Sequence, residues 1–332
     1  MADNEVSKIT WIAIVVALAG SIYGVSKTQI PALASSVFAK VSNLVETGDT
    51  NNAGSETAPV AEKPDSNDAK WVEKGNYGDN GYFVRDADGN GVVYALDDSK
   101  PILAPDGGSA FTKNSWELKT LKFLNKTILP VNASSYFTNN SSLTSFSSQN
   151  LDTSQVTNMS RMFDNNPSLT TLDVSNFNTS QVTYMHEMFW SMPSLTTLDL
   201  SNFDTSKVSD MHAMFADNHS LTTLDVSNFN TSQVTDMRAM FSSTRSLTTL
   251  NLSSFDTSKV TTMYAMFADA RSLTTLDLSS FDTANVTNMV AMFSNTQSLT
   301  TLDLSNFDTA KVTDKGGMFD GSMVNSDSAH LK

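Results

Sequence analysis

The sequence contains no cysteine among its 332 residues. It therefore excludes a disulfide, a thiolate metal site, a cysteine nucleophile and a lipid-bearing cysteine behind a signal sequence. Positive charge is also scarce, because 21 lysines and arginines stand against 35 carboxylates and leave a formal net charge of −14. Nucleic acids and anionic membrane surfaces attract clustered positive charge, so this balance argues against both as partners.

Catalytic motifs are missing as well. No nucleophile elbow, phosphate-binding loop or His-x-x-x-His pair lies near any of the four histidines, which are His186, His212, His219 and His330. The sequence therefore predicts a protein that is not an enzyme and that carries no organic cofactor.

A 26-residue repeat fills the chain from residue 143 to residue 319. Its most regular form reads Leu-Thr-Thr-Leu-Asp-Leu-Ser-Asn-Phe-Asp-Thr-Ser-Lys-Val-Thr-Asp-Met-x-x-Met-Phe. A fixed period of this length is typical of a stacked solenoid, in which each unit contacts only its neighbours. The leucine column holds Leu169, Leu195, Leu221, Leu247, Leu273 and Leu299, and the phenylalanine column holds Phe163, Phe189, Phe215, Phe241, Phe267, Phe293 and Phe319.

The unit that begins at Leu169 illustrates the expected coil. Leu169, Leu172 and Val174 follow the L-x-x-L-x-L pattern of a strand in a leucine-rich repeat. Phe177 comes next and is expected to stack as an aromatic spine between coils. Apolar residues then recur three or four apart, which favours a short return helix, and they are Val182, Met185, Met188 and Phe189. We therefore predict an α/β leucine-rich-repeat solenoid, with a parallel β-sheet on one face and short helices on the other.

Both ends of such a stack need caps, because one unit cannot bury enough apolar surface to fold alone. Residues 118–142 look like a degenerate capping repeat, with Tyr136 and Phe137 in place of Met-Phe. The regular repeats follow over 143–319, and residues 320–332 form a polar tail.

The repeat unit resembles the BspA-like leucine-rich repeat of bacterial surface proteins, which is common in Gram-positive commensals and mycoplasmas. The resemblance covers residues 143–319. It implies an extracellular, non-enzymatic protein used in adhesion or surface binding. The chain departs from two anchoring habits of such proteins, because it has no lipidated cysteine and its last residues contain no wall-sorting signal.

The N-terminal segment, residues 1–45, predicts a hydrophobic and then amphipathic helix. Residues 9–25, from Ile9 to Val25, carry no charge and would span about 25 Å as a helix, close to a bilayer's hydrocarbon thickness. Trp11 lies near one end, where aromatic rings favour the membrane interface. We expect this helix to anchor the protein in the membrane.

Two other interpretations of the helix stay open. It is also compatible with a secretion signal cleaved after Ala34, since Ala32-Leu33-Ala34 fits a small-x-small cleavage pattern. In addition, it resembles the N-terminal helix of a type IV pilin, with Glu5 near its start but without the family's glycine cleavage site. That resemblance implies self-assembly through residues 5–45.

Between the helix and the repeats, residues 46–70 have almost no large apolar side chain and predict a disordered linker. Residues 71–117 predict a small β-rich segment, with a β-hairpin over 82–96. The residues of this predicted hairpin also partly match the sequence of a calcium-binding loop, with Asp86, Asp88, Asn90 and Asp97 as ligands. The hairpin is favoured, because neither flank is helical, and calcium is kept as the one candidate cofactor.

Comparison of the repeats separates uniform columns from variable ones. The expected sheet face repeats the same threonine, aspartate and serine, whereas variation concentrates on the return side. Exposed aromatic and arginine side chains are typical binding anchors. The candidate ligand-binding residues are His186, Trp190, His212, Arg238, Arg245, Tyr264 and Arg271.

These observations together favour an extracellular adhesion or binding protein, displayed on the cell surface and anchored in the membrane through its N-terminal helix. Its partner would be a protein or glycan on a host or neighbouring cell. The alternative is a structural subunit that polymerises through the N-terminal helix into a pilus-like filament and displays the repeats.

Overall fold

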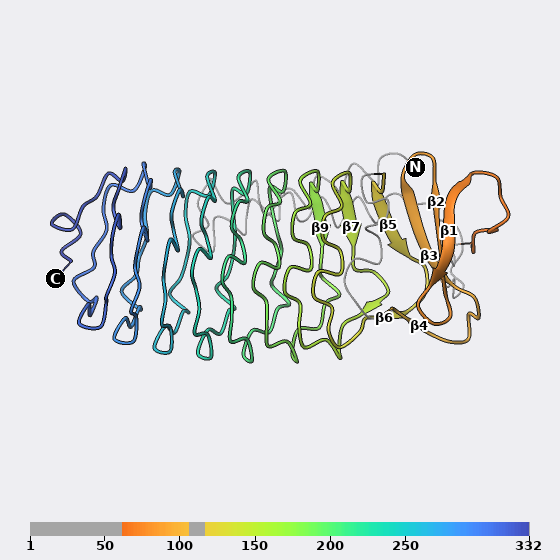
Figure 1. Cartoon of the computed structure of the whole chain (residues 1–332), viewed down its shortest axis with the longest axis horizontal. Helices are drawn as coiled ribbons and strands as arrows, with labels where there is room; N and C mark the ends of the chain where they lie inside the picture. Colours follow the sequence, from red (N-terminus) through yellow and green to blue (C-terminus); the bar gives the residue numbers. More distant parts are fainter. Residues whose placement is uncertain (1–61, 106–116, 332) are drawn as a thin grey trace, which may run out of the picture. The chain divides into compact units, whose positions relative to one another are not determined.

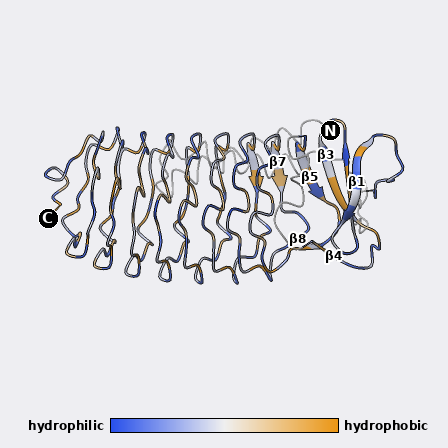
Figure 2. Ribbon diagram, in the orientation of Figure 1, coloured by the Kyte–Doolittle hydropathy of each residue, from blue (hydrophilic) through white to orange (hydrophobic). Residues whose placement is uncertain are grey.

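The structure is a computed structural model that describes residues 62–105 and 117–331. The predicted helix over 1–45, with Glu5, Ile9, Trp11 and Val25, lies outside the described residues. The described part is a stack of similar coils that runs from the strands of residues 71–95 to the C-terminal coil (Figure 1). Hydrophobic and hydrophilic stretches alternate around each coil, as a solenoid with an internal core requires (Figure 2).

Two sheets are present among the described residues. The larger has the order β1-β2-β3-β5-β7-β9 and the smaller the order β4-β6-β8. The larger consists of β1 (Trp71–Tyr77), β2 (Gly81–Asp86), β3 (Asn90–Ala95), β5 (Thr120–Phe123), β7 (Ser145–Ser147) and β9 (Thr171–Asp173). The smaller consists of β4 (Ile102–Leu103), β6 (Thr127–Ile128) and β8 (Leu151–Asp152). Strands β3, β5, β7 and β9 pair in parallel, which confirms the predicted parallel sheet for the first coils.

An antiparallel meander covers the N-terminal edge of this sheet. Strands β2 and β3 form the predicted hairpin, with Gly81 opposite Ala95, and β1 pairs with the outer side of β2. The hydroxyl groups of Tyr77 and Tyr136 lie 2.9 Å apart in the core and connect the meander to the first coil. The meander therefore takes up the strand edge that an uncapped solenoid would leave open.

The return side of the coils is the segment that was predicted to be a short helix, from Val182 to Phe189 in the unit described above. It differs from the prediction, because the described residues contain no helix. Glu187 and Ser191 adopt positive φ angles of 54° and 56°, which end any helical run. The backbone N–H groups of Met185, Glu187 and Phe189 donate to the next coil, over distances of 3.2, 2.9 and 3.1 Å. A helix would have used these N–H groups internally. The structure therefore replaces the predicted short helices with turns that form a second ladder between coils.

The methionines and phenylalanines of the repeat pack inside the coils. Met185, Met188 and Phe189 have no exposed surface. The rings of Phe189 and Phe215 stack with centroids 5.9 Å apart and planes at 9°, and the same column continues from Phe137 to Phe319. This column forms the aromatic spine. Phe177, which was expected to form it, lies outside this column and packs against Phe163, with ring centroids 6.2 Å apart and planes at 25°.

A column of buried threonines joins the coils at the corner after the sheet. The Thr231 hydroxyl donates to the backbone carbonyl of Asp256 and accepts from the backbone N–H of the same residue, both at 2.8 Å. A hydroxyl can do both at once, and valine, which has the same shape, can do neither. The same pair of bonds recurs at Thr153, Thr179, Thr205, Thr257 and Thr283.

The C-terminal end is covered by residues 322–331. Val324 and Ala329 are buried, and the N–H of Leu304 in the last coil donates to the Ala329 carbonyl at 2.8 Å. The segment expected to be a polar tail thus contributes apolar side chains and a backbone acceptor to the last coil.

The threonine column gives a direct test of this architecture. We expect Thr231→Val to lower the free energy of unfolding by about 1–3 kcal/mol, because it removes the buried hydroxyl that pairs with both the N–H and the C=O of Asp256. Urea unfolding followed by circular dichroism measures the loss. The exposed Thr223, replaced by valine in the same way, is the control and should change stability by less than about 0.5 kcal/mol. Equal effects of the two substitutions would contradict the role of the buried hydroxyl.

Candidate functional site

The candidate site is the return side of the coils, where the sequence varies most. Met185 and Met188 point into the core, while His186 and Glu187 between them are partly exposed. Backbone bridges join Tyr184 to its equivalent in the next coil, and so on along the stack. Each exposed side chain therefore lies beside its equivalents one repeat before and after.

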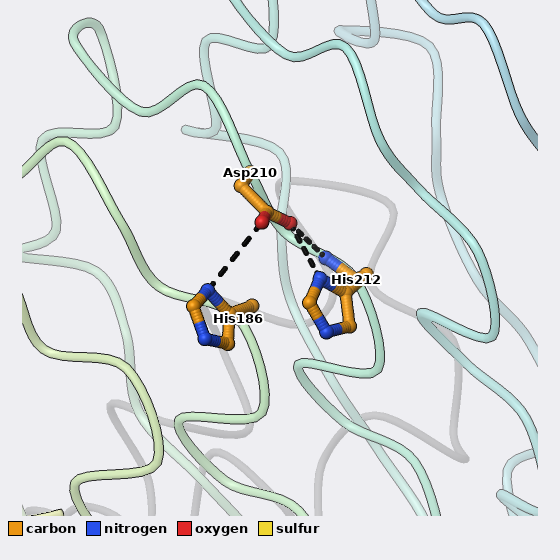
Figure 3. Close-up of side chains that lie close together, drawn as sticks. All are labelled: His186, Asp210 and His212. Carbon is orange, nitrogen blue, oxygen red and sulfur yellow. Dashed lines mark hydrogen bonds and ion pairs between the residues drawn. The ribbon is translucent and has the colours of Figure 1, made fainter. Parts of the chain in front are cut away.

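Two of the predicted binding residues, His186 and His212, lie side by side on adjacent coils (Figure 3). Their rings are stacked, with centroids 4.6 Å apart and planes at 6°. Asp210 lies between their Nδ1 atoms, 3.4 Å from that of His186 and 2.7 Å from that of His212. All three side chains are partly buried, with 14–26% of their surface exposed. The two histidines and one carboxylate thus converge from adjacent coils.

Hydrogen bonds and charges around this cluster shift the pKa values of Asp210 and His212. Burial would raise the pKa of Asp210, but hydrogen bonds from His186 and from the ring and backbone of His212 hold it well below its usual range. The hydrogen bond to Asp210 raises the pKa of His212, against the opposing effects of burial and of Arg238. Asp210 is therefore ionised, and His212 holds a proton more tightly than a free histidine.

A second carboxylate, Glu187, completes the surroundings of His212. Its Oε1 lies 3.2 Å from Nε2 of His212, and Arg161 from the preceding coil donates to both of its oxygens, at 2.6 and 3.1 Å. Burial would raise the pKa of Glu187, but Arg161 and His212 lower it. Glu187 is thus fixed in place on the opposite side of the His212 ring from Asp210.

Two other predicted residues, Arg238 and Tyr264, continue the His212 column and are exposed. The Nε of Arg238 lies 3.3 Å from Oδ2 of Asp236, an ion pair within one coil. Tyr264 has 44% of its surface exposed. This part of the column offers a guanidinium and an aromatic ring to a partner.

Trp190 belongs to a separate corner of the return side. Its indole Nε1 donates to Oδ2 of Asp217 at 2.8 Å, and the other oxygen of Asp217 lies 3.6 Å from Nε2 of His219. Trp190 is therefore held by its neighbour and is only partly exposed.

Arg245 and Arg271 share one carboxylate at the same corner, two coils further on. Asp269 accepts from Arg245 at 2.8 Å and from Arg271 at 2.6 Å. Both guanidinium groups stay exposed, with 43% and 46% of the side-chain surface accessible. The structure thus divides the seven predicted residues between a column with His186, His212, Arg238 and Tyr264 and a corner with Trp190, Arg245 and Arg271.

Asp210 and Glu187 were not predicted from the sequence as partners of the histidines. Asp210 lies two residues before His212 and belongs to another column of the repeat, so comparison within the histidine column does not bring the two together. The signal for Asp210 was present, because most residues of its column are Asp or Asn, and several accept a hydrogen bond from the backbone N–H two residues later.

The sequence matches the family described as "Mycoplasma protein of unknown function, DUF285" twice, over residues 131–224 and 217–330. Together the matches span more than half of the chain. The chain belongs to this family. The match supports the predicted resemblance to bacterial leucine-rich-repeat surface proteins, whereas no comparison shows a resemblance to pilins.

Among solved structures, this DUF285 chain is similar to a leucine-rich repeat protein from Eubacterium ventriosum. The identity is 15%, the match covers 76% of this chain and 96% of the other, and the TM-score is 0.22. No curated protein matches the DUF285 chain.

The sheet side of the DUF285 repeats carries a groove near the C-terminal end, with a volume of about 670 Å³. It is lined by equivalent leucines of successive coils, Leu250, Leu276 and Leu302, and by residues of the repeated threonine and aspartate columns. His330 also lines it, with its Nδ1 3.6 Å from Oδ1 of Asp303. The lining repeats one chemistry from coil to coil and offers few distinguishing contacts.

The structure does not assemble the calcium loop considered for Asp86, Asp88, Asn90 and Asp97. Asp86 accepts the backbone N–H and the side-chain amide of Asn90 at 2.8 and 3.0 Å, which closes the turn between β2 and β3. Asp97 follows the far end of β3 and accepts from Ser99. Strand β3 separates the two aspartates, because the chain is extended there and does not wrap around an ion.

No helix of the described DUF285 residues is long and apolar enough to cross a membrane. The residues predicted to anchor or assemble the protein lie in the part of the chain that the structure does not describe.

One further carboxyl group on the return side, that of Asp164, has a buried oxygen, Oδ1, that accepts no hydrogen bond among the described residues. Burial and the charge of Glu187 raise the pKa of Asp164 to about 6, although Arg161 opposes them. The folded-state pKa therefore exceeds the usual value of 3.8. The folded chain binds this proton more tightly, so the contribution of Asp164 to stability is full below pH 4 and is lost as the pH rises to 6.

We predict that Asp164→Ala stabilises the protein at pH 7.5 by about 1–3 kcal/mol, since one pKa unit corresponds to about 1.4 kcal/mol. Ala216 and Ala268 occupy the equivalent position, so the coil accommodates alanine there. Urea unfolding at pH 7.5 and pH 4 measures the gain, which should nearly vanish at pH 4. The exposed Asp320 of the same column, replaced by alanine, is the control. A gain that does not depend on pH would contradict the assignment.

Proposed function

We propose that this protein is a non-catalytic binding protein of the outer cell surface, whose return side adheres to a protein or glycan on a host or neighbouring cell. The family match and the repeat architecture support a surface-binding role. No cofactor is needed for such binding, because the contacts come from side chains on a rigid frame.

The proposal rests on the position of the exposed side chains that vary from coil to coil. Both ends of the stack are covered, so the lateral faces are what remains for a partner. Arg238, Arg245, Tyr264 and Arg271 are exposed on the return side, and backbone ladders between coils hold the segments that carry them. Arginine and tyrosine on a rigid frame bind with little loss of conformational entropy.

Repetition supports the same role. Equivalent positions recur once per coil, so a partner with a repeated structure, such as a glycan, can engage several coils at once. Weak contacts that act together raise the apparent affinity by orders of magnitude without any single strong site. We propose that residues 1–45 anchor the protein in the membrane and that the linker 46–70 holds the stack away from it.

Accessibility on intact cells tests the proposed location. We expect a protease of broad specificity, added outside intact cells, to cut within the predicted linker, residues 46–70, and to release a fragment that contains the repeats. The uncut protein should require detergent for extraction and should behave as single particles. Full protection of the repeats in intact cells would contradict surface display, and long fibres in the sheared supernatant would favour the pilus-like alternative.

Paired substitutions test the proposed binding surface. We expect Arg238→Ser combined with Tyr264→Ser to weaken adhesion to target cells by at least about tenfold, since two anchor side chains together contribute more than about 1.4 kcal/mol. Serine occupies this column at Ser160, so the coil should fold unchanged. The control is the sheet-side pair Thr197→Ala and Thr223→Ala, two exposed residues. Adhesion that only the control pair reduces would place the surface on the sheet side.

A further inference from the structure

Two histidines and an aspartate of adjacent coils meet at one point on the return side. One ligand atom from each of His186, Asp210 and His212 lies within 4.8 Å of the others (Figure 3). Among the described residues, no other set of three histidine or carboxylate groups converges in this way. Imidazole nitrogen and carboxylate oxygen are ligands that Zn²⁺ and similar divalent transition metals prefer.

Asp210 is positioned before any metal binds. Its Oδ1 accepts the backbone N–H of His212 at 3.0 Å, the turn bond that its column repeats along the stack. That turn does not need a carboxylate, because Asn158 and Asn288 make the same bond with an amide. The charge at residue 210 is therefore not required by the fold.

His212 has the support that metal-bound histidines have in proteins. Its Nδ1 faces Asp210, while its Nε2 lies 3.2 Å from Glu187, which Arg161 holds with two hydrogen bonds. A carboxylate on the second ring nitrogen orients a histidine ligand and makes its first nitrogen a better donor to a metal.

His186 is held by the preceding coil and by ring stacking. Its Nδ1 lies 3.1 Å from the hydroxyl of the buried Ser160 and 3.4 Å from Oδ2 of Asp210. Bonds of about 2.1 Å to a tetrahedral metal separate ligand atoms by about 3.4 Å. The 3.4 Å between Nδ1 of His186 and Oδ2 of Asp210 matches this spacing, whereas the 2.7 Å between Nδ1 of His212 and Oδ1 of Asp210 is shorter. Small rotations of the side chains bring the three ligand atoms to the spacing of a bound site.

We propose that His186, Asp210 and His212 bind one divalent transition metal ion of the zinc class, which clamps two adjacent coils together. The site is partly exposed, so solvent or a partner's side chain has access to the remaining coordination position. This site goes beyond the proposed surface role and does not depend on it.

Cobalt binding tests the site, because Co²⁺ takes zinc positions and its visible absorption reports nitrogen and oxygen ligands in a tetrahedral arrangement. The full chain in detergent, titrated with Co²⁺ and then with Zn²⁺ as competitor, is expected to bind one ion. Zn²⁺ should displace Co²⁺ and raise the melting temperature. No saturable binding of either ion would overturn the proposal.

Substitutions taken from the repeat itself locate the ion without disturbing the coil. His186→Ser copies Ser160, His212→Val copies Val290, and Asp210→Asn copies Asn158 of the respective columns. Each should weaken Co²⁺ binding by at least tenfold while the circular dichroism spectrum stays unchanged. Asp210→Asn is the most informative, because it keeps the turn and removes only the charged ligand.

The matched control is His219→Arg, which copies Arg245 and removes a histidine outside the cluster. It should bind Co²⁺ as tightly as the unaltered chain. Binding that survives both His186→Ser and His212→Val, or that His219→Arg abolishes, would show that the ion lies elsewhere and would overturn the assignment.

Discussion

Hydrogen bonding between coils is the interaction on which the rest of this structure depends. Each coil leaves backbone groups unpaired within itself and satisfies them in its neighbour, 25 or 26 residues along the chain. On the return side Glu187 donates to the His212 carbonyl, and at the corner Thr205 bridges both backbone groups of Asn230. A buried polar group without a partner costs about 1–3 kcal/mol, so the coils must keep one length and the stack must end in caps.

Because the coils stack in strict register, side chains of the same kind lie next to one another. This stabilises some columns and destabilises others. The phenylalanines gain from it, since Phe189 and Phe215 stack nearly in parallel inside the core. The aspartates of the sheet side repel one another, because adjacent coils place equal charges side by side. Asp199 and its equivalents each accept a hydrogen bond from the backbone N–H two residues later, which turns the carboxylate toward its own coil. Uniform columns are thus tolerated where local bonds offset the repulsion.

The repeat, the buried columns and the parallel sheet of the first coils followed from the sequence, because period and apolar spacing determine them directly. The conformation of the return side did not follow from the sequence. Met185, Met188 and Phe189 recur at three and four residues, which fits a helix and fits two successive turns equally well. The residues that decide between them, Glu187 and Ser191, have positive φ without being glycine, so the sequence carried little sign of it. The pairing of Asp210 with two histidines was hidden for a related reason, since it joins different columns across a coil boundary.

The same backbone frame supports different chemistry at each step of the stack. At one coil Asp236 pairs with Arg238 across 3.3 Å, at the next Thr262 stands before an exposed Tyr264, and at the preceding boundary Asp210 meets two stacked histidines. The turn needs only a side-chain oxygen at the first of these positions, and it leaves the residue two places later free to vary. Single substitutions therefore change what the surface binds without changing the coil. The stacked backbone sets the distances between side chains, and the residue at each position sets the chemistry. Specific sites on this fold are therefore expected where neighbouring coils meet rather than within one coil.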